Sequence, residues 1–231
     1  CNLLSADYVS FYNLKIDLLN TPQAQQILAL GLERLPHALL LTGPEGLGKA
    51  AFGQWLANLL LCEFQKTDLS ACGQCEACRW LTGGNHPDFR HIAPASEDDQ
   101  ENENRDKAKK RPTGTIRIDQ IRELESFVAV GSHRMGRRVV LLTEAEAMNN
   151  AAANSLLKIL EEPPSSVYFI LVSSRSRFLL PTIRSRCRAL GFSPPDPDIA
   201  TRILGDAGLG SKAERYLGLA GGAAFRVARW K

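Results

Sequence analysis

The sequence predicts an α/β fold with a parallel sheet, and two kinds of observation support this prediction. Short, continuous apolar runs occupy residues 37–41, 137–144 and 168–174, which is the pattern of strands buried on both faces of a sheet. Helical patterns separate these runs along the chain. A glycine-rich turn directly follows the first run and ends in Gly48 and Lys49, where a helical pattern begins. This order of strand, turn and helix is typical of parallel sheets whose strands are joined by helices.

Length and composition are those of a globular protein. The 231 residues are enough for one large or two smaller domains, and the apolar fraction of 44% and charged fraction of 23% are ordinary. The net charge of +3 does not by itself require a nucleic-acid partner. No run approaches the roughly 18 apolar residues of a membrane span, and no signal peptide is visible. We therefore expect a cytoplasmic chain with reduced thiols. The first residue is Cys1 rather than Met, which leaves open a fragment or added residues that are not native.

The first predicted elements are a helix, a strand and a second helix. Thr21 is a suitable cap and Pro22 a suitable first residue for a helix over residues 21–35. The strand over residues 37–41 follows this helix. After the glycine-rich turn, apolar residues at helical spacing predict a helix from residue 49 to about residue 61.

The turn between this strand and helix has the features of a phosphate-binding loop. Gly43 and Gly48 allow backbone N–H groups to converge on an anion, and Lys49 would reach the outer phosphates. In a working ATP site, a hydroxyl after the lysine and an aspartate at the end of a later strand hold Mg²⁺. Ala50 and Thr143 occupy these positions, so productive binding of ATP and Mg²⁺ is not expected. Weak phosphate binding and a purely geometric role for the glycines both remain open.

Four of the six cysteines lie between positions 62 and 78, and their spacing predicts a metal site. Cys62, Cys72, Cys75 and Cys78 can place four thiolates around Zn²⁺, and four protein ligands make such a site structural. Disulfides fit poorly with a reducing compartment, and a redox C-x2-C pair or four unrelated thiols would be competing interpretations. His86 could be a further ligand, but a local structural role is expected for it.

The rest of the chain predicts further α/β elements and then a second domain. We expect a short strand over residues 89–92, a polar loop over 96–114, a helix capped by Asp119, and a helix over 151–162 that a pair of prolines ends. The prolines at 194, 195 and 197 predict a linker, and helical patterns follow it. The predicted organisation is an α/β domain over residues 1–192, with a zinc module at 62–78, and a small, truncated helical domain over 193–231.

Several motifs occur here in the same order as in bacterial clamp-loader subunits of DNA polymerase III, which are AAA+ proteins. They are the phosphate loop, the four-cysteine insert, the block over residues 154–164 that ends in Glu-Glu-Pro-Pro, and Ser185-Arg186-Cys187. The chain most closely resembles the delta-prime family, through residues 86–88, residues 119–122 and its degraded phosphate loop. The similarity covers roughly residues 21–228.

The resemblance implies a RecA-like AAA+ domain, a small helical lid and a collar domain, for which this chain ends too early. It implies a stator in a ring-like assembly that loads the sliding clamp onto primed DNA. Arg186 would be an arginine finger that acts in trans on ATP held by a neighbouring subunit. Ser173 lies where related ATPases carry a hydroxyl that senses the γ-phosphate. The implied partners are the gamma or tau motor subunits, the delta subunit, the sliding clamp and primed DNA contacted without sequence specificity, with no membrane.

Two further functions compete with the stator. One is an active motor-type ATPase of the clamp loader, and the other is an unrelated zinc-stabilised phosphotransferase. Ala50 and Thr143 argue against both, because neither side chain supplies the usual Mg²⁺ ligand. We therefore expect no ATPase activity from the chain itself, although it would belong to a DNA-directed DNA polymerase assembly. A plain surface role for Arg184, Arg186 and Arg188 is the alternative to the arginine finger.

Overall fold

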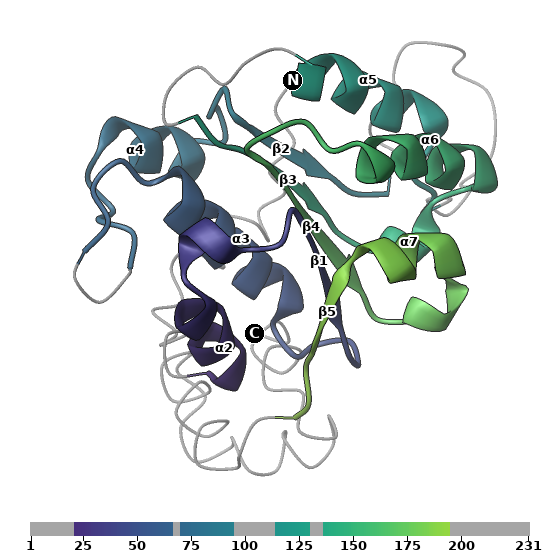
Figure 1. Ribbon diagram of the computed structural model, residues 1–231, viewed down its shortest axis with the longest axis horizontal. Coiled ribbons are helices and arrows are strands. Elements are labelled where there is room, and N and C mark those ends of the chain that lie inside the picture. Colours follow the sequence, from purple (N-terminus) through teal and green to yellow (C-terminus); the bar gives the residue numbers. More distant parts are fainter. Residues whose placement is uncertain (1–20, 67–69, 95–113, 130–135, 195–231) are drawn as a thin grey trace, which may run out of the picture.

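Five parallel strands form one sheet in the part of the chain that the structure describes. The computed structural model describes residues 21–66, 70–94, 114–129 and 136–194 (Figure 1). The strand order is β2-β3-β4-β1-β5, and every pair of neighbours is parallel. The strands are β1 (Ala38–Thr42), β2 (Phe89–Ile92), β3 (Arg138–Leu142), β4 (Val167–Ser173) and β5 (Arg188–Gly191). The prediction of an α/β fold with a parallel sheet is confirmed.

Helices cover both faces of this sheet (Figure 1). The α-helices are α2 (Pro22–Leu30), α3 (Lys49–Leu61), α4 (Glu76–Thr82), α5 (Ile118–Ala129), α6 (Asn150–Glu161) and α7 (Pro181–Arg186). Three short 3-10 turns are η2 (Leu32–Arg34), η4 (Ala145–Ala147) and η5 (Ser176–Phe178). Helix α3 lies on one face of the sheet, whereas α5, α6 and α7 lie on the other.

Alternate residues of the strands build two separate apolar cores. Leu39 and Leu41 of β1 pack with Phe52 of α3 on one face. Leu40 of the same strand belongs to the core that contains Ile183 of α7 on the other face. Because side chains alternate along a strand, a sheet with helices on both faces needs apolar residues at successive positions. This requirement explains the unbroken apolar runs of the sequence.

Three predicted details of the elements are wrong. The first helix ends at Leu30, because Gly31 adopts a φ of 76° and the chain continues as a 3-10 turn rather than an α-helix to residue 35. Asp119 is not the cap of its helix, since α5 begins at Ile118 and Asp119 lies in the first turn. The segment that forms β5 carries no predicted strand, although it pairs with β1 at the sheet edge.

Some predicted segments lie outside the described residues. These are most of the polar loop, the linker beyond Pro194, the helices after it, and with them the predicted second domain over residues 193–231. Within the described ranges, none of the helices combines the length and the apolar character that a membrane span requires.

Candidate functional site

The phosphate loop has the predicted geometry of strand, turn and helix. It joins the carboxyl end of β1 to the first turn of α3, and Gly48 precedes that helix in a left-handed conformation with a φ of 78°. Gly43 has a φ of 140° and lies against the segment that follows β5. A Cβ atom at Gly43 would come within 2.3 Å of the backbone oxygen of Phe192, so this close approach requires glycine.

Lys49 is buried in this loop, and the loop itself provides most of its hydrogen-bond acceptors. Its Nζ donates to the backbone oxygen of Gly43 at 2.7 Å, to that of Pro44 at 2.6 Å and to the hydroxyl of Ser174 at 3.1 Å. An ammonium group has three hydrogens, so these contacts match its full donor capacity. Burial lowers the pKa of Lys49 to about 8, and the charges of Glu146 and Glu45 partly oppose this shift.

The two residues that replace the usual Mg²⁺ ligands are Ala50 and Thr143. Ala50 is the second residue of α3 and presents a methyl group. The Thr143 hydroxyl lies directly after β3, 3.0 Å from Nε2 of His91 and 3.4 Å from the backbone oxygen of Ile92. Burial lowers the pKa of His91 to about 4, so this ring is neutral at pH 7. The hydroxyl of Thr143 is thus engaged with the neighbouring strand β2.

The structure places two residues beside the phosphate loop that the sequence analysis did not single out. Ser174 follows β4 and contacts Lys49, whereas the predicted sensor, Ser173, is fully buried and accepts a hydrogen bond from the backbone N–H of Arg175. Glu146, in the 3-10 turn after β3, accepts from the backbone N–H groups of Ser174 and Arg175. No sequence signal marks Glu146, because its place beside the loop depends on the adjacency of β3 and β4.

Arg186 lies at the amino end of the strands, whereas the phosphate loop lies at their carboxyl end. It is the last residue of α7, and Cys187 separates it from β5, whose first residue, Arg188, is paired with Leu39 near the amino end of β1. The four residue steps of β1 span about 13 Å, so the loop at its carboxyl end is distant from Arg186. The guanidinium Nη2 of Arg186 lies 2.7 Å from Oε1 of Glu161, and Nη1 donates to the backbone oxygen of Thr182 at 3.2 Å. The arginine side chain is 34% exposed.

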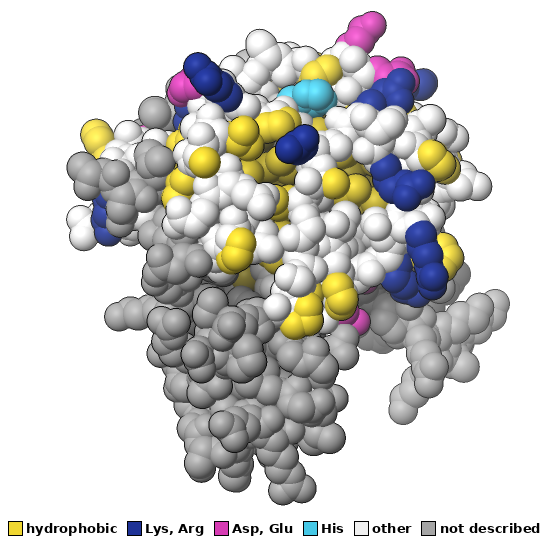
Figure 2. All heavy atoms as spheres, turned by 60° about the horizontal axis from the view of Figure 1, so that its bottom comes forward, with side chains coloured by type: hydrophobic (Ala, Val, Ile, Leu, Met, Phe, Trp, Pro, Cys, Tyr) yellow, Lys and Arg dark blue, Asp and Glu magenta, His cyan; other side chains and the backbone are white. Residues whose placement is uncertain are grey.

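The surface near α7 and η5 is basic. Figure 2 shows Lys and Arg side chains gathered on the side of the molecule where these elements lie. This surface also carries an exposed aromatic ring, Phe178, with the guanidinium groups of Arg177 and Arg175 at 5.1 and 5.8 Å from its centroid. Helix α7 contributes Arg184 and Arg186 in its last turn, of which Arg184 is exposed and Arg186 is half-buried.

The structure brings the four predicted cysteine ligands together. The sulfur atoms of Cys62, Cys72, Cys75 and Cys78 all lie within 4.8 Å of one another, and the Cys72 and Cys78 sulfurs are 4.0 Å apart. Four sulfurs at about 2.3 Å from a tetrahedral Zn²⁺ would be about 3.8 Å apart. This set of four thiols could therefore hold a metal ion.

Backbone N–H groups favour the thiolate form of Cys72, whereas burial raises the pKa of the Cys62 and Cys78 thiols, which a bound cation would have to offset. The N–H groups of Gln74 and Cys75 point at the Cys72 sulfur and lower the pKa of this thiol to about 6. Further N–H groups point at the sulfurs of Cys62 and Cys75. Such N–H···S contacts hold the sulfurs in place, so the donor set fits a metal through its four sulfur ligands and their spacing.

His86 is buried outside this cysteine cluster. Its Nδ1 accepts from the backbone N–H of Asp88, and its ring makes an edge contact with Trp80. Asp88 in turn lies 3.4 Å from Nε of Arg138, and both side chains are almost fully buried. These contacts fit the local structural role that the sequence predicted for His86.

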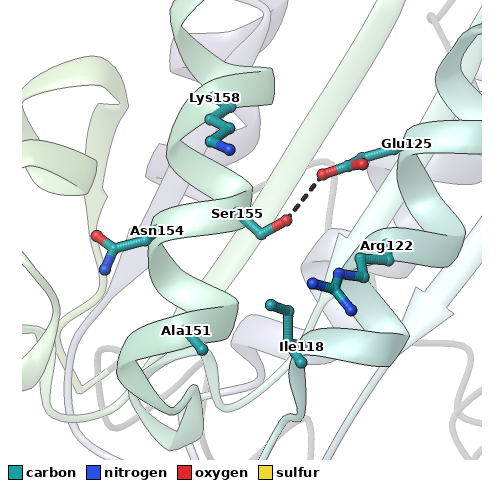
Figure 3. A pocket seen from close by; sticks show the side chains of 7 residues that line it. All are labelled: Ile118, Arg122, Glu125, Ala151, Asn154, Ser155 and Lys158. Carbon is teal, nitrogen blue, oxygen red and sulfur yellow. Dashed lines mark hydrogen bonds between the residues drawn. The ribbon is translucent and has the colours of Figure 1, made fainter.

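A groove of about 400 Å³ lies between α5 and α6 on the face opposite α3. Figure 3 shows Arg122 and Lys158 at its sides, with the hydroxyl of Ser155 donating to Glu125 across the groove at 2.8 Å. Asn154 also lines it. The groove is mixed in charge, with two cations and one carboxylate.

The strand order and the phosphate loop define the class of this protein as an AAA+ domain with a RecA-like sheet. The same fold occurs in a DNA polymerase III gamma subunit-related protein from Thermotoga maritima, which superposes with a TM-score of 0.50 at 21% identity over 84% of this chain and 54% of that one. The family model described as "DNA polymerase III, delta subunit" matches residues 22–196. The chain belongs to this family.

Curated relatives agree with this assignment. The chain is 44% identical over 151 residues to DNA polymerase III subunit delta' of Pseudomonas aeruginosa, which covers 65% of this chain and 41% of that protein. It is 30% identical over 164 residues to subunit tau of Bacillus subtilis, covering 71% of this chain and 26% of that protein. The chain thus spans less than half the length of these curated relatives.

Proposed function

We propose that this chain acts in a bacterial clamp loader as a delta-prime stator, which takes part in loading the sliding clamp onto primed DNA. The observation that carries the proposal is the separation of its two phosphate-directed features. A phosphate loop without the usual cation ligands lies at the carboxyl end of the strands, and a half-buried arginine that is paired with Glu161 lies at their amino end.

Arg186 is the residue proposed to act on ATP of a neighbouring subunit. The length of β1 argues against contact with the loop of its own chain, so any phosphate it binds belongs to another molecule. Its present partner, Glu161, is half-exposed, and a surface ion pair of this kind contributes at most about 1 kcal/mol. Exchange of Glu161 for a phosphate therefore costs little, and the planar guanidinium suits bidentate binding of phosphate oxygens.

The loop of this chain is proposed not to hydrolyse ATP. Mg²⁺ neutralises charge on the outer phosphates during hydrolysis, and protein ligands normally position it. Ala50 has no oxygen to offer, and the Thr143 hydroxyl is hydrogen-bonded to β2. Gly43, Gly48 and Lys49 then serve mainly to shape the turn.

The metal at the four cysteines is proposed to be a structural Zn²⁺. Four thiolates in a closed arrangement suit tetrahedral zinc and leave no open ligand position. Bound zinc would tie the end of α3 to α4, since Cys62 ends the former and Cys75 precedes the latter.

The partners and the domain division remain part of the same proposal. Motor subunits of gamma or tau type, the delta subunit and the clamp would assemble with this chain, and residues 193–231 would form a separate helical lid. DNA would be contacted through its phosphates without base recognition, as expected for proteins that track a duplex. The cations Arg122 and Lys158 in the groove between α5 and α6 support this last contact.

The substitution Arg186→Ala in a reconstituted clamp loader tests the proposal. Arginine fingers contribute about 10³–10⁵ in rate, so hydrolysis at the one ATP site that this subunit faces should nearly stop and the overall rate should fall. The measurement is steady-state ATP hydrolysis with primed DNA and clamp present. Arg184→Ala is the matched control, since it removes another arginine from the same helix. An unchanged rate for Arg186→Ala in a folded, assembled subunit contradicts the proposal.

A further inference from the structure

A continuous chain of contacts joins the carboxylate of Glu146 to the lysine of the phosphate loop. Oε1 of Glu146 accepts from the backbone N–H of Ser174 at 3.0 Å and from that of Arg175 at 3.1 Å. The hydroxyl of Ser174 accepts from Nζ of Lys49 at 3.1 Å. The carboxylate therefore lies at the point where the end of β4 faces the loop.

Several hydrogen-bond donors at the end of the phosphate loop, among them the ammonium group of Lys49, are engaged by the protein itself. The other two hydrogen bonds of Lys49 go to the backbone oxygens of Gly43 and Pro44. The N–H groups of Ser174, whose hydroxyl contacts Lys49, and of Arg175 are directed at Glu146. A phosphate could reach these donors only by displacing the internal acceptors.

The charge of Glu146 also acts directly on the loop. Its second oxygen, Oε2, is buried and has no hydrogen-bond partner among the described residues. This oxygen lies in a poorly solvated place, where Coulomb interactions are strong, and although burial lowers the pKa of Lys49, the charge of Glu146 acts to raise this pKa. It attracts the ammonium group of Lys49 and repels any second anion that approaches.

We propose that Glu146 is a built-in anion that partners Lys49 electrostatically and excludes nucleotide phosphates from the loop of this chain. The inference rests on the proposed function, because it explains how this subunit avoids using ATP itself. It differs from the loss of cation ligands at Ala50 and Thr143. Those positions affect Mg²⁺, whereas Glu146 acts on the phosphate even when no Mg²⁺ is present.

The test is calorimetric titration of the full chain with pyrophosphate and with ADP in the absence of Mg²⁺. Glu146→Gln keeps an acceptor for the N–H groups of Ser174 and Arg175 but removes the charge. We expect this variant to bind both probes at least about tenfold more tightly than the parent chain. Glu45→Gln is the matched control, because Glu45 is an exposed acid of the same loop, and its effect should stay within about threefold.

Two results would overturn the inference. One is equal affinity of the parent chain and a folded Glu146→Gln variant, and the other is an equal gain in Glu45→Gln, which would indicate a general charge effect. If Glu146→Gln does not fold, the inference is tested on the parent chain by following the nitrogen NMR signal of the Lys49 ammonium during titration with pyrophosphate. This signal should not respond to about 1 mM pyrophosphate, and a response that saturates at micromolar concentration would refute the inference. None of these results bears on Arg186→Ala, which reports on ATP of a neighbour.

Discussion

Single backbone positions fix the shape of the phosphate loop more firmly than its side chains do. Gly43 adopts a φ of 140°, and the backbone oxygen of Phe192 lies only 2.3 Å from the position that a Cβ atom would take. Phe192 is held there because its N–H donates to the oxygen of Thr42 at 2.7 Å. The glycine therefore serves the packing of β1 against the segment after β5, whatever the loop binds.

Gly43→Ala should destabilise the chain by about 3 kcal/mol, because backbone strain and the clash with Phe192 add together. Urea denaturation followed by circular dichroism measures this change. Gly191→Ala is the matched control, since a Cβ there meets no atom within 4 Å, and it should be neutral or slightly stabilising. Equal stability of the two variants would show that the loop relaxes around the added methyl group.

At the scale of elements, the cysteine module is an appendage beside the sheet rather than part of its core. The buried residues around the thiols form a cluster of their own, Cys62, Cys75, Ala77 and Cys78. The two cores on the faces of the sheet contain none of these four residues. Order in the module should therefore depend on the proposed Zn²⁺, and order in the sheet should not.

Removal of zinc by a chelator should loosen the module and leave the sheet intact. Amide hydrogen exchange should accelerate over residues 70–82, whereas strands β1, β3 and β4 should keep their protection. Cys72→Ser should reproduce the effect and lose the metal, while Cys187→Ser, outside the cluster, should retain about one zinc per chain. Simultaneous loss of protection in the sheet would mean that the metal supports the whole fold.

At the scale of the whole molecule, the parallel sheet places two groups of polar residues at the opposite ends of its strands. The carboxyl edge carries Lys49, Thr143, Glu146 and Ser174, as expected for the ligand side of an open α/β sheet. The amino edge carries Arg186 together with Glu161. The proposed stator role requires this separation, because the subunit would leave its own loop unused and act on the ATP of a neighbour.

This arrangement predicts that MgATP will not stabilise the isolated chain. With a dissociation constant weaker than about 1 mM, about 1 mM nucleotide adds at most about 0.4 kcal/mol and shifts the melting temperature by about 1 °C. A motor-type site of micromolar affinity would add about 4 kcal/mol and shift it by roughly 10 °C. Thermal denaturation with and without MgATP separates the two cases, and turnover by the chain would favour the motor.

Much of the fold could be read from the sequence because its signals are local. Apolar runs located β1, β3 and β4, a short strand was expected where β2 lies, and the proline pair marked the carboxyl end of α6. The strand β5 was not predicted, because most of its residues are exposed at the sheet edge and Arg188–Gly191 therefore has no apolar run. The cap of α6 is Asn149, whose side chain accepts from the N–H of Ala152, which is a local signal that could have been used.

The sequence by itself determined the phosphate loop, the four thiols and the family, because each depends on residue type and spacing along the chain. Only the tertiary structure decided which groups meet across it. Glu146 reaches the loop through the adjacency of β3 and β4, and the distance between Arg186 and its own loop follows from the direction of β1. Such contacts join residues far apart in sequence, so the packing of the sheet, and no local pattern, specifies them.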